Sequence, residues 1–421
     1  MWKTPLLKNS GTAAVLALAL GMLFAAQAFP VLAQTPPQEI TRSQIRLFSS
    51  ETEVVGGPFP GLLLIPNTRP SYRDEKYDRP YHVACHVYVE VPSVHGGSEP
   101  VYRRRFLVCA ADTDGLALTR QVARFLLMLY GERRERIHDD HPENLPTVNV
   151  WLTERVEPGL SQDTGGEQFQ NQIYIYNIHR ERPPIEWARE VAHEYGHYAL
   201  PGVSGFTEPE EWANGVLGER LFLKWIRDDL RAGRLKNDDL VFVTGDLLDD
   251  YFARTVWPLI RRILREGADA RMLTRTKAEG MDYYTGIALY VDTVYGSSVL
   301  VDAMQDTRSA SPLTFPRASD FLTGVRRALN SDKEFVLSLP ALGAAEKENT
   351  LFFYLPAGAW LVRPEGSALS WRVRTDSKSG IACTGTLVKA RIGGWYPLAY
   401  VRASDTAVPA RLTFRKRGQA R

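Results

Sequence analysis

The hydrophobic and polar positions divide the chain into a strand-containing N-terminal part, a helical middle and a strand-rich C-terminus. Short apolar or alternating runs predict strands over residues 61–65, 81–91, 101–110, 147–152 and 172–178. Apolar residues also recur at helical spacing from Leu116 to Gly131, which predicts one long helix. The N-terminal part therefore mixes strands with a helix.

The pattern changes twice further along the chain. From about residue 181 to 340 it is mostly helical, and glycines and the Pro201-Gly202 pair separate the helices. From 341 to 421, Val, Thr, Trp and Tyr at short spacings with Gly turns predict a small antiparallel β-domain. We therefore expect an α+β protein with an α/β lobe (34–180), a helical lobe (181–340) and a β-sandwich-like domain (341–421).

The first 33 residues have the pattern of a secretory signal peptide. Lys3 and Lys8 precede a run of small and apolar residues, and two small-residue cleavage sites follow, the later one ending at Ala33. We expect removal of residues 1–33 and a protein that is secreted or periplasmic. An uncleaved N-terminal anchor is the alternative, and it also places the folded part outside the cytoplasm.

Composition and charge exclude some classes of protein and argue against others. Hydrophobic residues make up 44% and charged residues 24%, a mix that excludes a disordered or fibrous protein. The net charge of +2 comes from Lys3 and Lys8, so the remaining chain is neutral, which argues against general nucleic-acid binding. Residues 341–421 carry 13 Lys and Arg against 5 Asp and Glu, a net charge of +8.

This basic C-terminal part has two interpretations. With Trp360, Trp371 and Trp395 it could hold an anionic cell-surface polymer, a lipid headgroup or a substrate. The interpretation that we favour is a β-sandwich whose tryptophans lie in the core and which packs on the acidic remainder of the chain. Fold alone does not decide between the two.

Two of the three cysteines lie on neighbouring predicted strands. Cys85 and Cys109 come roughly opposite each other if residues 81–91 and 101–110 form a hairpin, and a bridge there would add about 3 kcal/mol. Two buried free thiols are the alternative. Cys383 is left without a partner.

The segment from Ile185 to Leu200 carries the candidate chemistry. Two prolines precede it and Pro201-Gly202 follows it, as expected for a helix. His193 and His197 are four residues apart, so both imidazoles lie on one helix face and can bind one Zn²⁺. Glu194 beside them can take a proton from a water whose pKa the metal lowers to about 7. This is the HExxH pattern.

A catalytic zinc needs a third protein ligand. Leu200 and Val203 exclude the extended HExxHxxGxxH form. Glu219 lies on the apolar stripe of a helix predicted over 212–226, where an unpaired carboxylate costs several kcal/mol. Zinc ligation would offset that cost, and a buried salt bridge with an Arg is the alternative. Weaker candidates are Glu208, Glu210 and Glu211, which precede or begin that helix, and Asp282.

The segment His193–His197, with Glu219 downstream, resembles the gluzincin zinc peptidases, which include thermolysin and the zinc aminopeptidases. The resemblance implies a zincin-like catalytic region with His193, His197 and Glu219 as zinc ligands and Glu194 as general base. It also implies that Tyr283, with Tyr284 as second choice, stabilises an oxyanion, and that residues 172–178 form the edge strand that pairs with a peptide.

The resemblance covers about residues 115–300 and has departures. Arg220 follows Glu219 where the aminopeptidases have Gly, their amine-anchoring Gly-x-Met-Glu-Asn stretch is absent, and Leu223 replaces an Asp of the thermolysin type. The sequence thus favours an exported zinc endopeptidase acting on peptide or protein substrates. The alternative is a secreted binding or scaffold protein on an inactive zincin-like fold. The intact Glu194 favours the enzyme, because a fold kept only for binding needs no base beside the ligands.

Overall fold

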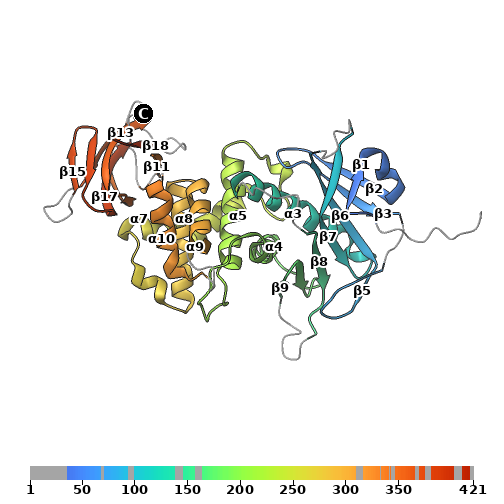
Figure 1. Cartoon of the computed structure of the whole chain (residues 1–421). Coiled ribbons are helices and arrows are strands. Elements are labelled where there is room, and N and C mark those ends of the chain that lie inside the picture. Colours follow the sequence, from blue (N-terminus) through green and yellow to red (C-terminus); the bar gives the residue numbers. More distant parts are fainter. Residues whose placement is uncertain are drawn as a thin grey trace, which may run out of the picture.

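The computed structural model describes residues 36–67, 71–92, 99–137, 146–156, 164–309, 316–331, 333–340, 342, 347–365, 369–374, 381–402 and 410–417. The signal peptide predicted for residues 1–33 lies outside these ranges. Within them, none of the helices combines the length and the apolar character needed to span a membrane. The protein is a mixed α+β structure in which a sheet, a group of helices and a β-sandwich follow one another (Figure 1).

A mixed sheet forms the N-terminal part. Its strand order is β2-β3-β6-β7-β8-β10-β9, and β1 pairs with β7 beside this path. The pairs β7–β8 and β8–β10 are parallel, whereas the other neighbours are antiparallel. The strands are β1 (Glu39–Thr41), β2 (Ser49–Val55), β3 (Gly61–Pro66), β6 (Val83–Val91), β7 (Val101–Ala110), β8 (Val148–Thr153), β9 (Gly165–Phe169) and β10 (Gln172–Tyr176).

The edge strand differs from the one predicted. Residues 172–178 were expected at the edge, but β10 lies one place inside it, and the antiparallel β9 forms the edge. β9 reads Gly-Gly-Glu-Gln-Phe. It has neither an apolar run nor an alternating one, so hydrophobic periodicity does not reveal it.

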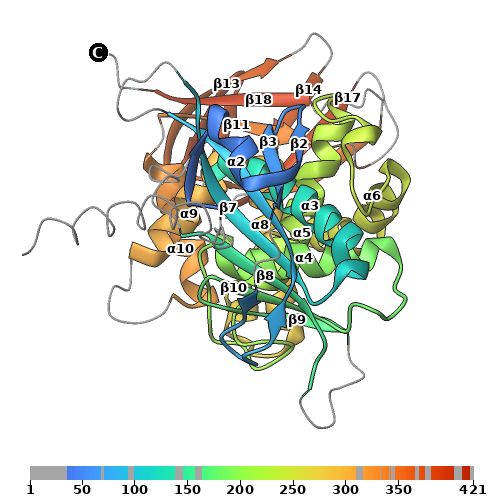
Figure 2. The ribbon, with the colours of Figure 1, turned by 90° about the vertical axis from the view of Figure 1, so that its right-hand side faces the viewer.

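Helices α3 (Leu116–Ile137) and α4 (Pro184–Ala199) cover one face of the sheet (Figure 2). The opposite face carries a separate aromatic cluster that includes Trp151, Tyr174 and Tyr176. The small hairpin of β4 (Tyr72–Arg73) and β5 (Pro80–Tyr81) packs there. Short helices η2 (Arg42–Gln44), α2 (Ile45–Phe48) and η3 (Thr113–Gly115) complete this part.

The two strand cysteines do not form a disulfide. Strands β6 and β7 pair in a register that sets Cys85 opposite Val108 and Cys109 opposite Ala84. Side chains of adjacent register positions point to opposite faces of a sheet. Cys85 is therefore buried among the residues under α3, Cys109 is buried in the aromatic cluster, and both are free thiols.

The middle of the chain is helical, as predicted, and lies between the sheet and the β-sandwich (Figure 1). Helix α5 packs along α4, and α8 packs with α7 and α9. The helices are α5 (Asn214–Arg231), η5 (Asn237–Asp239), α6 (Gly245–Tyr251), the π-helical η6 (Phe252–Val256), α7 (Trp257–Glu266), η7 (Ala270–Thr274), α8 (Ala278–Val294), α9 (Ser297–Ser309) and α10 (Ala318–Ser331).

The C-terminal part consists of antiparallel sheets, as predicted, but its first strand precedes residue 341. One sheet has the order β11-β18-β13-β16-β15 and the other β12-β17-β14. Their strands are β11 (Glu334–Leu339), β12 (Glu348–Leu355), β13 (Gly358–Glu365), β14 (Leu369–Val373), β15 (Ile381–Thr384), β16 (Leu387–Ala390), β17 (Gly394–Arg402) and β18 (Ala410–Lys416).

This β-sandwich is anchored on the helices. The Tyr290 hydroxyl donates to the Phe352 carbonyl oxygen and the Tyr295 hydroxyl to the Tyr354 carbonyl oxygen, each at 2.9 Å. Trp360 is fully buried, and Trp395 packs against Tyr290 with ring centroids 5.6 Å apart. All three tryptophans therefore contribute to packing, since Trp371 and Trp395 lie partly buried against the core.

Candidate metal centre

Helix α4 has the boundaries that its prolines predict. Pro184 is its first residue, where the missing N–H has no intrahelical partner, and Leu200 after its end is extended. One face of α4 is buried, with Trp187, Val191 and Tyr195 among its apolar side chains. His193 and His197 lie on the part of the helix that is only partly covered.

Two glycines let α5 approach this face closely. A Cβ on Gly218 would lie 2.5 Å from the Cα of Gly196, and a Cβ on Gly196 would lie 2.8 Å from the Cα of Gly218. Both distances are shorter than real Cβ contacts, so the backbones of α4 and α5 meet only because neither residue has a side chain. This crossing brings the start of α5 next to the two histidines.

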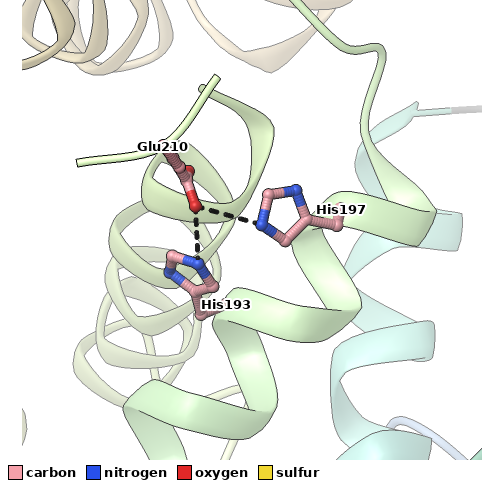
Figure 3. A group of neighbouring side chains, drawn as sticks. All are labelled: His193, His197 and Glu210. Carbon is pink, nitrogen blue, oxygen red and sulfur yellow. Dashed lines mark hydrogen bonds and ion pairs between the residues drawn. The ribbon is translucent and has the colours of Figure 1, made fainter. Parts of the chain in front are cut away.

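Glu210, in the segment before α5, joins the two imidazoles. Its Oε2 lies 3.0 Å from the Nε2 of His193 and 3.2 Å from the Nε2 of His197 (Figure 3). Its Oε1 accepts the backbone N–H of Val216 at 3.1 Å, which fixes the carboxylate at the N-terminus of α5. Within the described residues, His193, His197 and Glu210 are the group with metal-ligand spacing.

Asn214 determines which nitrogen of His197 carries hydrogen. Its Nδ2 donates to the carbonyl oxygens of His197 at 2.9 Å and Leu200 at 3.4 Å, so its Oδ1 faces the Nδ1 of His197, 3.0 Å away. Nδ1 must then donate. In the neutral ring, Nε2 presents a lone pair to a carboxylate oxygen of Glu210, and two lone pairs repel unless a proton or a cation lies between them.

Gly215 lets both imidazoles lie against the start of α5. A Cβ on this residue would lie 2.3 Å from the Nε2 of His197 and 2.7 Å from the Nε2 of His193. A side chain at 215 would therefore push the two rings away from the positions in which both face Glu210. Two imidazoles and one carboxylate are also a donor set of catalytic zinc sites. The residues present therefore fit a zinc ion.

Glu219, predicted as the third ligand, lies on the other side of His193. Its Oε2 is 3.8 Å from the Nδ1 of His193, and its Oε1 accepts from Arg189 and from the Tyr251 hydroxyl, each at 2.7 Å. The structure thus places Glu210, rather than Glu219, where a third ligand shared by both Nε2 atoms would lie. Glu219 instead supports the histidine ring from behind, as carboxylates near metal-bound histidines commonly do.

The electrostatic surroundings favour a positive charge at His193. Burial lowers the pKa of His193, but its hydrogen bond to Glu210 and the nearby carboxylate of Glu219 outweigh burial and raise it well above the usual value. Burial raises the pKa values of Glu210 and Glu219, yet their positively charged and hydrogen-bonding partners lower both to about 2. The site thus holds ionised carboxylates around imidazole nitrogens, an environment suited to a divalent cation.

Glu194 lies against the edge strand β9. Its carbon Cγ lies 2.5 Å from the position that a Cβ on Gly166 of β9 would take. The side chain is buried, and within the described residues its Oε2 has no hydrogen-bond partner. Burial is the largest influence on its pKa and raises it to about 8. A buried carboxylate with a free oxygen beside a candidate metal centre is suited to proton transfer.

The other predicted residues lie elsewhere. The Tyr283 hydroxyl accepts the backbone N–H of Asp269 at 2.7 Å and donates to the Gly267 carbonyl oxygen at 3.4 Å, so it is bound to the segment after α7. Asp282 forms an ion pair with Arg220 at 3.0 Å. Tyr284 is buried, with its ring near Phe206 and Phe321. None of the three forms a hydrogen bond to the histidine pair.

Sequence reasoning gave too little weight to three residues of this site. Glu210 was only a weaker candidate, and Asn214 and Gly215 were not considered. An Asn-Gly pair at the start of the helix that follows the motif is the signal that could have pointed to them. Neither a protein-family model nor a curated protein matches this chain.

Proposed function

We propose that this chain is an exported zinc-dependent peptidase, with His193, His197 and Glu210 as metal ligands and Glu194 as general base. The observation that carries the proposal is the forced orientation of His197, whose Nε2 faces a carboxylate oxygen because Asn214 occupies its Nδ1. A cation between them removes the repulsion, and Gly215 lets both imidazoles face the Glu210 carboxylate.

Zinc bound there would polarise a carbonyl group and lower the pKa of a coordinated water to about 7. The residues of the chain supply the remaining steps. Glu194 takes a proton from the attacking water on its free Oε2 and returns it to the leaving amine. Asn214 and Glu219 hold the two imidazoles in orientation from their Nδ1 sides.

Edge strand β9 supplies a place for the substrate. Within the described residues it pairs on one side with β10, and α4 lies below it. Its other edge has backbone groups to which an extended peptide can add as a further strand. Gly166 brings this edge directly over Glu194. We propose endopeptidase activity, because the chain lacks the amine-anchoring stretch of the zinc aminopeptidases.

Metal content and peptidase activity of the purified protein test the proposal. Wild type should bind one zinc per chain and cleave a denatured protein or a peptide mixture. Glu194→Gln should retain zinc and lose at least about 100-fold in kcat, since general-base catalysis contributes about 10²–10⁴-fold. Glu181→Gln, an exposed carboxylate shortly before the same helix, is the matched control.

Glu210→Gln should lose zinc, because the amide carries no negative charge to offer the ion. The proposal is falsified if wild type binds no zinc at micromolar concentration, or if Glu194→Gln cleaves as fast as wild type. A stable, metal-free wild-type protein without activity would instead favour a binding or scaffold role.

A further inference from the structure

We propose that Glu190 makes this site select substrates with a Lys or Arg side chain at the position that pairs with Gly166 of β9. This inference rests on the peptidase proposed above and names the class of peptide that it takes. Glu190 lies on α4 one turn before Glu194, and it belongs neither to the candidate ligands nor to the proton-transfer step.

The carboxylate of Glu190 reaches the edge strand because two glycines lack side chains there. Its Oε1 lies 2.8 Å from the position that a Cβ on Gly166 would take and 3.9 Å from that of Gly165. Glu194 lies beside the same position. The α4-facing side of β9 is therefore lined by two carboxylates at this point.

A substrate strand presents one side chain to these carboxylates. Side chains directly opposite each other on paired strands point to the same face, with their Cβ atoms about 4.5–5.5 Å apart. The Cβ direction of Gly166 points toward Glu190 and Glu194. The substrate residue opposite Gly166 consequently directs its side chain toward α4, and a long basic side chain there spans the distance to Glu190.

The neighbouring carboxylates already have partners, whereas Glu190 lacks one. Glu167 pairs with Lys76 at 2.6 Å, and Glu219 pairs with Arg189. Within the described part of the chain, Glu190 forms neither a hydrogen bond nor an ion pair. Glu194, which is 4% exposed, likewise has an Oε2 without a partner. Glu190 is therefore a carboxylate that the described residues leave without a partner and that takes no part in metal binding or proton transfer.

Arg182, whose charge acts on Glu190, is held by other groups. Arg182 lies over the ring of Trp187, and its guanidinium donates to the carbonyl oxygens of Tyr176 and Asn177. Burial raises the pKa of Glu190 despite the opposing charges of His193 and Arg182. A cation brought by the substrate would therefore supply the partner that the protein itself does not.

Blocked, fluorescence-quenched peptides test this selectivity. The cleaved bond is first located by mass spectrometry, and each flanking position is then varied among Lys, Arg, norleucine and Glu. Wild type should show kcat/KM about tenfold or more higher for Lys or Arg than for norleucine at one position, a difference of about 1.4 kcal/mol. Glu190→Gln should reduce this ratio to about twofold or less, whereas Glu181→Gln should keep it.

A binding measurement separates this inference from the peptidase proposal. The Glu194→Gln protein, titrated calorimetrically with the same peptides, should bind the Lys peptide about tenfold more tightly than the norleucine peptide. The additional change Glu190→Gln should remove that difference. A ratio near one in both assays, or a preference for basic side chains that survives Glu190→Gln, overturns the inference. Absence of cleavage with the binding preference intact would overturn only the peptidase.

Discussion

Gly215→Ala is expected to weaken zinc binding at least 100-fold while the fold stays intact. The added methyl carbon would lie 2.3 Å from the Nε2 of His197 and 2.7 Å from the Nε2 of His193. These distances are far below the nonbonded contact distance of about 3.5 Å, so the methyl group displaces both imidazoles from the positions in which they share the ion. A 100-fold loss corresponds to about 2.7 kcal/mol.

The metal-free protein should respond differently to the same substitution. Gly215 is the second residue of α5, and alanine is preferred over glycine inside a helix by about 0.8–1.0 kcal/mol. Part of this gain is lost when the imidazoles move away from the methyl group. We therefore expect the free energy of unfolding without zinc to change by less than about 1 kcal/mol.

Thermal and chemical unfolding with and without zinc separates the two effects. At a free zinc concentration 100 times its Kd, wild type should gain about 2.7 kcal/mol, and a variant with 100-fold weaker binding only about 0.4 kcal/mol. Gly56→Ala, where a Cβ has open space around it, is the control and should behave as wild type. Wild-type zinc affinity in Gly215→Ala would refute the proposed position of the ion.

Three further changes test other parts of the structure. Glu219→Gln should weaken zinc binding by about 10–100-fold, less than Glu210→Gln, because it removes support for a ligand rather than a ligand, and competition with a chelator measures both. Added reductant should leave the melting temperature unchanged, since Cys85 and Cys109 are free thiols on opposite faces of the sheet, and a drop of several degrees would contradict this register. Lys224→Met should cost about 3–5 kcal/mol in urea unfolding, because it leaves buried Asp292 without its ion-pair partner at 2.6 Å, and a loss below 1 kcal/mol would contradict the pairing.

Hydrophobic periodicity predicted the elements that bury an apolar face. Strand 101–110 has the predicted bounds, and the apolar run in its second half is buried on both faces of the sheet. Helix α3 extends to Ile137, six residues past the predicted end at Gly131. Its last turns bury charged residues, and Arg136 forms ion pairs with Glu132 and Asp229 that no apolar pattern records.

The pattern failed where the backbone rather than the side chains determines the position of an element. β9 has two glycines and no apolar run, yet it is held by backbone pairing with β10 and by close contact with α4. The cysteines show a related limit. A shift of one residue in pairing moves a side chain to the opposite face, and the sequence of a hairpin with a long connection does not fix the register to that accuracy.

The choice between Glu219 and Glu210 shows that burial predicts whether a carboxylate needs a partner but not which partner it has. The premise that a carboxylate on an apolar helix stripe needs a partner is met, since Glu219 is buried and receives hydrogen bonds from Arg189 and Tyr251. That premise does not identify the partner, because an arginine, a tyrosine or a zinc ion each satisfies it. Glu210 lies in a non-helical segment, where no periodicity assigns a direction to its side chain.

What orients Glu210 is the helix that follows it. The N–H of Val216 donates a hydrogen bond to its Oε1. The close approach of α5 to α4 at Gly196 and Gly218 brings its Oε2 within hydrogen-bond distance of both histidines. The first is a local contact across six residues, and the second is a tertiary contact between two helices. A candidate ligand set in a sequence of this kind is therefore better sought at the N-terminus of the helix that packs on the motif than at the polar positions within that helix.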